Sequence, residues 1–135
     1  MFSSSKPRLS AELLSSELGT AVPAGELEVL DRLATTIRVA EGDQIVQKNG
    51  FGRECFVVID GQFKVERDDL TILVGPGTVI GEMALLTLKP RTASVTAAVD
   101  SSVYVLTPTE FATLLDTCPN IAQYVLDGAA RRAAA

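Results

Sequence analysis

A glycine, a glutamate and an arginine lie close together near the middle of the chain, at Gly81, Glu82 and Arg91. An arginine guanidinium holds an anion such as a phosphate through two parallel hydrogen bonds. A carboxylate accepts hydrogen bonds from hydroxyl groups such as those of a sugar, and a glycine lets the backbone approach a ligand closely. Together these residue types suit a cyclic phosphodiester of ribose.

The neighbouring residues extend this chemistry. A helical turn that starts at Glu82 would point free backbone N–H groups at an anion, whereas Lys89 lacks the fork geometry of a guanidinium. The Thr92 hydroxyl suits the phosphate or, with the base syn above the sugar, the exocyclic amine of guanine. Glu82 would distinguish ribose from deoxyribose by its 2′-hydroxyl.

The same residues also have a purely structural interpretation. Gly81 would then serve only as a turn between a strand and a helix, and Glu82 with Arg91 would form an ordinary surface ion pair, which contributes little to stability. The residue types alone leave both interpretations open.

A β-rich region must position these residues. From Ile37 to Leu106 the sequence consists of short runs rich in Val, Ile, Thr and Phe, broken at near-regular intervals by glycines. Asp60-Gly61 is the tightest hairpin signal, because that turn favours positive φ. We predict an eight-stranded antiparallel, jelly-roll-like β-roll with strands at 36–40, 44–48, 55–60, 62–67, 70–74, 78–80, 93–99 and 102–107.

Helices are expected on both sides of the β-roll. Ser10 is a suitable cap for a helix over 11–18 that ends at Gly19, and a second helix follows Pro23. After Pro108 the helical pattern returns, and Gly128 weakens the last helix. The expected organisation is a flexible leader at 1–9, an N-terminal helical segment at 10–35, the β-roll at 36–107 and C-terminal helices at 108–135.

Composition narrows the function. The chain has 135 residues, 47% of them hydrophobic, which suits one domain with a real core. A net charge of −5 argues against a nucleic-acid partner. With no histidine we expect no metal and no enzyme of the common hydrolase types. Without an apolar run of membrane-spanning length or a signal peptide, we expect a cytoplasmic protein that does not itself bind a membrane.

A longer motif carries a family resemblance. Gly81-Glu82-Met83-Ala84-Leu85-Leu86 with Pro90-Arg91-Thr92-Ala93-Ser94-Val95 resembles the phosphate-binding cassette of cyclic nucleotide-binding domains, here 81–95. It is similar to the cassettes of cyclic-AMP-dependent kinase regulatory subunits and cyclic-nucleotide-gated channels, and less closely to that of the bacterial catabolite activator. The resemblance extends from about Val22 to Leu126.

The resemblance implies a role for each matching position. Glu82 would take the ribose hydroxyl, Arg91 would take the phosphate, and backbone amides near Ala84 and Thr92 would assist. None of the matching positions departs from the family pattern. The residues implied to bind ribose and phosphate are Gly81, Glu82, Met83, Ala84, Arg91, Thr92 and Ala93.

The base pocket is less defined by sequence. Ile72 and Val74 share one strand face with Val65 opposite, although such residues also build an ordinary core. The family covers the base with a residue of the last helix, and Tyr124, Val125 or the Arg131-Arg132 pair would fit without a motif to choose among them.

The resulting hypothesis is a regulatory module that binds cyclic AMP, with cyclic GMP as the alternative, and transmits binding through its terminal helices to a protein effector or a homodimer partner. The preference for cyclic AMP is an analogy with bacterial-looking members.

Three other functions compete with this hypothesis. A catabolite-activator-type transcription factor would need more chain after Leu126 than remains, so it requires that this chain be a fragment; a channel or enzyme fragment is also compatible. A docking domain would use its apolar grooves for a protein partner and would bind no nucleotide. A cupin-like enzyme would need metal-binding histidines.

Overall fold

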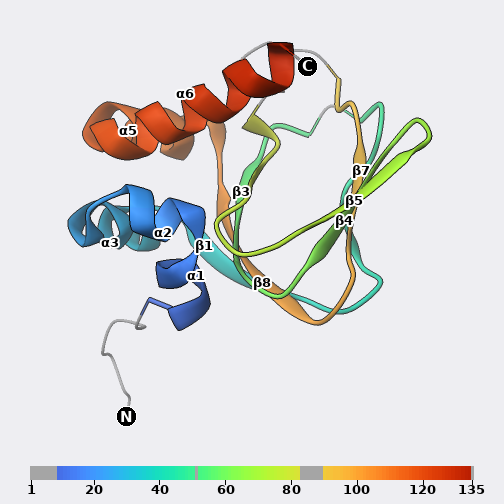
Figure 1. Cartoon of the computed structure of the whole chain (residues 1–135), viewed down its shortest axis with the longest axis horizontal. Helices are drawn as coiled ribbons and strands as arrows, with labels where there is room; N and C mark the ends of the chain where they lie inside the picture. The colour runs from blue at the N-terminus through green and yellow to red at the C-terminus, as the bar shows by residue number, and fades with distance from the viewer. Residues whose placement is uncertain (1–8, 51, 83–89, 135) are drawn as a thin grey trace.

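The computed structural model describes residues 9–50, 52–82 and 90–134. Two four-stranded antiparallel sheets stack on one another, and helices from both ends of the chain cover one of them (Figure 1). The predicted class, an eight-stranded β-roll with flanking helices, is confirmed.

Each sheet combines strands that are distant in sequence. The inner sheet, which contacts the helices, has the order β1-β8-β3-β6, and the outer sheet has the order β2-β7-β4-β5. The inner strands are β1 (Thr35–Val39), β8 (Ser101–Leu106), β3 (Cys55–Asp60) and β6 (Val79–Ile80). The outer strands are β2 (Gln44–Val46), β7 (Ser94–Ala97), β4 (Phe63–Arg67) and β5 (Leu70–Val74).

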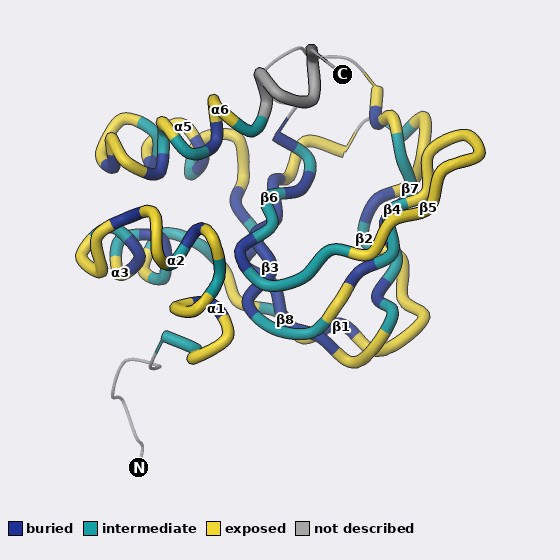
Figure 2. Tube along the Cα trace, in the orientation of Figure 1, coloured by how far each residue is buried: buried dark blue, intermediate teal, exposed yellow. Residues whose placement is uncertain are grey.

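Strand β3 is buried over all but its last residue, and most of its tube is dark blue (Figure 2). Alternate side chains of a strand point to opposite sides. Cys55 and Val57 therefore enter the core beneath the helices, whereas Phe56 and Val58 enter the core between the sheets. Burial on two sides explains why this strand is an unbroken apolar run rather than an alternating one.

The predicted Asp60-Gly61 hairpin is wrong. Gly61 does have positive φ, +88°, but β3 and β4 belong to different sheets, so the turn carries the chain from the inner to the outer sheet. The tight hairpin is β4–β5, where Arg67 pairs with Leu70 across two aspartates. Asp68 adopts φ +54° there, which Asp tolerates better than most residues.

The helices are α1 (Ala11–Ser15), α2 (Glu17–Ala21), α3 (Ala24–Leu33), α5 (Pro108–Thr117) and α6 (Pro119–Ala134). The single helix expected over 11–18 is instead two helices that break at Ser16. The Ser16 hydroxyl donates to the Leu13 carbonyl at 2.6 Å and accepts from the Gly19 amide at 3.1 Å, so it ends α1 and caps α2. Gly19 therefore lies inside a helix.

Side chains from the N-terminal helices fix the start of α6. The Glu26 carboxylate of α3 accepts from the Ile121 amide at 2.9 Å and from Asn120 Nδ2 at 2.7 Å. The Tyr124 hydroxyl donates to Glu17 of α2 at 3.2 Å. These contacts join helices from the two ends of the chain. α6 continues through Gly128, and no described helix is long and apolar enough to cross a bilayer.

A buried tyrosine attaches α3 to the inner sheet. The Tyr104 hydroxyl of β8 donates to Asp31 at 2.7 Å. Burial, with this hydrogen bond and the Asp31 charge, raises the pKa of Tyr104 above its ordinary value. The tyrosine is therefore neutral at physiological pH and remains a hydrogen-bond donor.

The role of Glu26 can be tested by substitution. Glu26→Ala removes a cap from α6, so we expect the free energy of unfolding to fall by about 1–2 kcal/mol in urea denaturation. Glu28→Ala, which removes an exposed carboxylate of the same helix, should stay within about 0.5 kcal/mol of the parent protein. Equal losses for both variants would contradict the capping role.

Candidate functional site

A cavity of about 410 Å³ lies on the face of the outer sheet that looks toward the inner sheet. Its volume is within the range of about 300–1,000 Å³ that is usual for small-molecule sites. Apolar side chains supply most of the wall, and a few polar groups stand among them. The apolar lining includes Val46, Val65, Leu70, Ile72, Val74 and Val95, and the polar lining includes Arg67, Glu82, Arg91 and Thr92.

The Arg91 guanidinium is buried and held in one orientation. Its Nη1 donates to the Gly81 carbonyl at 3.1 Å, and its Nη2 donates to the Glu54 carbonyl at 2.6 Å. Its backbone is also fixed, because its amide donates to the Gly50 carbonyl at 2.9 Å and its carbonyl accepts from the Asn49 amide at 2.9 Å. Only 6% of Arg91 is exposed. The cation is thus positioned before any ligand arrives.

The electrostatic state of this arginine favours an anion. Burial lowers the pKa of Arg91 from its ordinary value, and the charge of Glu54 partly reverses that effect. An arginine starts from so high a pKa that it remains protonated. The two acceptors that its guanidinium meets among the described residues are neutral carbonyls, which hydrogen bond the cation without cancelling its charge. An anionic ligand in the cavity would add to the partial compensation that the Glu54 charge provides.

Gly81 is required by the position of this guanidinium. It has φ +89°, a conformation that side chains disfavour. A Cβ atom at this position would also collide with Arg91 Nη1 and lie 2.9 Å from the Glu54 carbonyl oxygen. A glycine is therefore needed both for the backbone conformation and for the space that the arginine occupies.

Glu82 is 2% exposed and lines the same cavity as Arg91. A buried carboxylate is costly to desolvate, so its place in a cavity calls for hydrogen-bonding groups around it. The alternative that Glu82 and Arg91 form an ordinary surface ion pair is wrong, since both side chains are buried.

The structure brings most of the predicted site residues together. Thr92 is exposed at the cavity, and Ala93 lies half-buried beside it. Val65 pairs with Ile72 across the β4–β5 ladder, and both line the cavity together with Val74. The predicted contacts of Met83 and Ala84 lie outside the described residues.

Two of the predicted covers of the base, Tyr124 and Val125, do not line the cavity. Tyr124 hydrogen bonds to Glu17, and Val125 is 3% exposed within the helix-side core. The side chains of Arg131 and Arg132 lie outside the described part of α6. The helical spacing of Tyr124 and Val125 is explained by packing on the other helices.

Sequence reasoning missed Arg67, which lines the cavity from β4. A signal for it existed, because Arg67 follows Val65 at the two-residue spacing that keeps strand side chains on one face.

As for metal ligands, the described residues contain no group of three His, Cys, Asp or Glu side chains able to hold an ion.

Fold and site together define a class: a β-roll domain whose cavity pairs an apolar wall with a fixed, buried cation. Residues 36–118 match the family described as the cyclic nucleotide-binding domain, and this chain belongs to that family.

Curated relatives include channels and effectors. The chain is 32% identical over 109 residues to a cyclic nucleotide-gated potassium channel of Rhizobium etli, covering 81% of this chain and 30% of the channel. It is 31% identical to a Pycsar effector protein of Burkholderia cepacia, covering 84% of this chain and 38% of that protein. The chain thus spans about a third of the length of these relatives.

Solved structures share the fold. The catabolite activator protein of Thermus thermophilus superimposes with a TM-score of 0.76 and 26% identity, over 87% of this chain and 58% of that one. A structure described by the words "A cyclic-GMP-dependent signalling pathway regulates bacterial phytopathogenesis" superimposes with a TM-score of 0.72 and 28% identity, over 83% of this chain and 94% of that one.

The contact between Gly81 and Arg91 generates a prediction. Gly81→Ala should lower the free energy of unfolding by clearly more than Gly42→Ala, as measured by urea denaturation. Gly42 is a matched control because its φ is +91° but open space surrounds its Cβ position, so its substitution should cost only the backbone strain of about 1 kcal/mol. Equal costs would show that the guanidinium does not pack on Gly81.

Proposed function

We propose that this chain is a regulatory module that binds a cyclic purine nucleotide, cyclic AMP or cyclic GMP, in the cavity. The observation that carries the proposal is the buried Arg91 guanidinium, held by two neutral carbonyls at the edge of an apolar cavity. Membership of the cyclic nucleotide-binding domain family supports the choice of ligand.

Each part of the nucleotide has a partner in this proposal. The Arg91 guanidinium binds the cyclic phosphate, and backbone amides near Ala84 and Thr92 assist. Glu82, buried beside Gly81 in the same cavity, accepts a hydrogen bond from the ribose 2′-hydroxyl. The base lies on an apolar wall formed by Val65, Ile72 and Val74.

The terminal helices transmit binding in this proposal. The polar contacts of α6 with the N-terminal helices depend on two carboxylates, Glu26 and Glu17. Such contacts are individually weak, so a ligand with different affinities for two helix arrangements can shift their populations. The receiver is a protein effector, another part of a longer chain or a second copy of this module. The Rhizobium channel and the Burkholderia effector are each about three times as long as the segment that they share with this chain.

The phosphate contact is tested by calorimetric titration with cyclic AMP and cyclic GMP. Arg91→Ala should weaken both by at least about 3 kcal/mol, more than a hundredfold, because it leaves a desolvated phosphate without its cation. Arg38→Ala, an exposed arginine of β1 outside the cavity, should bind like the parent protein.

Since Arg91 also bridges two carbonyls, Arg91→Lys serves as a second variant, and circular dichroism checks that each variant folds. The same titration with a 2′-deoxy cyclic nucleotide tests Glu82: the parent protein should bind it more weakly than the ribonucleotide, and Glu82→Ala should bind the two alike. If folded Arg91→Ala binds as tightly as the parent protein, the phosphate assignment is wrong. Absence of any nucleotide binding by the parent protein would favour a docking domain.

Transmission is tested by amide hydrogen exchange with and without nucleotide. We expect the exchange rates of α6 amides near Asn120 and Ile121 to change on binding, because their contact with Glu26 is rearranged. Amides of β1, none of whose residues lines the cavity, provide the internal reference. Unchanged exchange throughout α6 at saturating nucleotide would contradict the mechanism.

A further inference from the structure

A second arginine lines the cavity and has no part in the phosphate contact proposed above. Arg67 is the last residue of β4, and the alternation of that strand places its side chain on the cavity face together with Val65. It is exposed at the rim. Within the described residues its guanidinium makes no hydrogen bond or ion pair, so its five N–H donors are available to a ligand.

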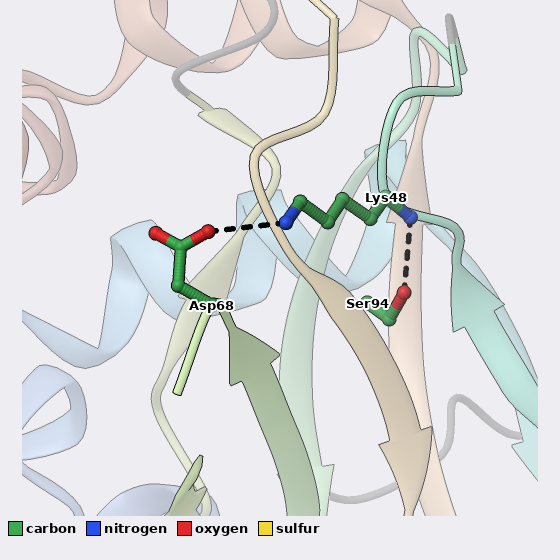
Figure 3. Close-up of polar contacts among 3 residues, drawn as sticks. All are labelled: Lys48, Asp68 and Ser94. Atoms are coloured by element: carbon green, nitrogen blue, oxygen red, sulfur yellow. Dashed lines mark hydrogen bonds and ion pairs between the residues drawn. The ribbon is translucent and has the colours of Figure 1, made fainter. Parts of the chain in front are cut away.

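Two acidic residues flank Arg67 in sequence, Glu66 and Asp68, and Asp68 is directed elsewhere. Asp68, which follows Arg67 in the β4–β5 turn, points toward Lys48, with 3.2 Å between Nζ and Oδ1 (Figure 3). The backbone of Lys48 is itself fixed, since its amide donates to the Ser94 hydroxyl at 3.0 Å. This exposed pair adds little stability. Within the described residues neither Glu66 nor Asp68 forms an ion pair with Arg67.

The two guanidinium groups differ in what holds them, although Arg91 itself precedes β7 of the same outer sheet that carries Arg67. The Arg91 guanidinium is fixed to carbonyls at Glu54, just before β3, and at Gly81, just after β6, both next to the inner sheet. Arg67 comes from the outer sheet. Because Glu66 pairs with Ser94, Arg67 lies level with Ala93.

A nucleotide whose phosphate contacts Arg91 would extend its base toward the outer sheet. The apolar side chains of Val65, Ile72 and Val74 on that sheet would contact the face of the base. Arg67, on the same β4–β5 hairpin, would then meet the edge of the base.

The edge of the base decides which purine fits. Guanine presents two adjacent acceptors, O6 and N7, which match the fork of a guanidinium, whereas adenine replaces O6 by an amino group that opposes the N–H donors. Resting on the function proposed above, we infer that Arg67 selects guanine and that the ligand of this cavity is cyclic GMP. This differs from the preference for cyclic AMP that analogy suggested from sequence.

Calorimetric titration with cyclic GMP, cyclic AMP and cyclic IMP tests the inference. The parent protein should bind cyclic GMP and cyclic IMP about tenfold more tightly than cyclic AMP. This factor is at the low end of the discrimination expected from a bidentate guanine contact, because Arg67 is exposed to solvent. Arg67→Ala should lose that tenfold preference while its affinity for cyclic AMP changes by less than about threefold. Arg38→Ala is again the matched control.

Two comparisons separate Arg67 from other sources of selectivity. Cyclic IMP keeps O6 and N7 but lacks the 2-amino group, so selection through the Thr92 hydroxyl would make it bind more weakly than cyclic GMP in the parent protein and overturn the role of Arg67. Arg67→Lys keeps the charge but not the fork, so it should lose the preference as Arg67→Ala does. Thermal midpoints of the variants should agree within about 2 °C.

Equal weakening of cyclic AMP and cyclic GMP in Arg67→Ala would assign Arg67 to the phosphate and overturn the inference. Tight binding by the parent protein without a preference for guanine would overturn the inference alone and leave the proposed function standing. No binding of any of the three nucleotides would overturn both.

Discussion

The burial of one guanidinium organises the candidate site. Arg91 reaches its place only because Gly81 has no side chain, and its two donors hold the chain before β3 against the chain after β6. The surrounding carbonyls are neutral, so the arrangement holds a cation in a poorly solvated position without cancelling its charge. A cavity with this property is prepared for an anion, and the cost of orienting the arginine is met during folding rather than during binding.

The inner sheet connects the site to the ends of the chain. Its central strand β3 begins beside the Arg91 contact at Glu54 and sends alternate side chains into the two cores, one facing the helices and one facing the outer sheet. The helices from both ends are joined to each other through Glu26 and to the inner sheet through Tyr104 and Asp31. Packed contacts therefore run from the Arg91 contact at Glu54 through β3 to the helices.

Local patterns predicted the elements better than their pairing. The eight strands lie within a few residues of their expected positions, because apolar runs and turn residues act over short distances. The Asp60-Gly61 turn has the expected positive φ, yet it links two sheets, since a turn specifies its own backbone conformation and not the partner of the next strand. Likewise the break at Ser16 depends on one hydroxyl that bonds in both directions, which helical periodicity does not report.

The sequence by itself determined the class of fold, the family resemblance and the residues Gly81, Glu82 and Arg91 as candidates, because these depend on residue type and spacing along the chain. Only the tertiary structure decided that Glu82 and Arg91 are buried in one cavity rather than paired on the surface, that Tyr124 and Val125 belong to the helix packing, and that Arg67 faces the same cavity. Burial and facing depend on which strands lie side by side, and that is fixed by contacts between segments far apart in sequence.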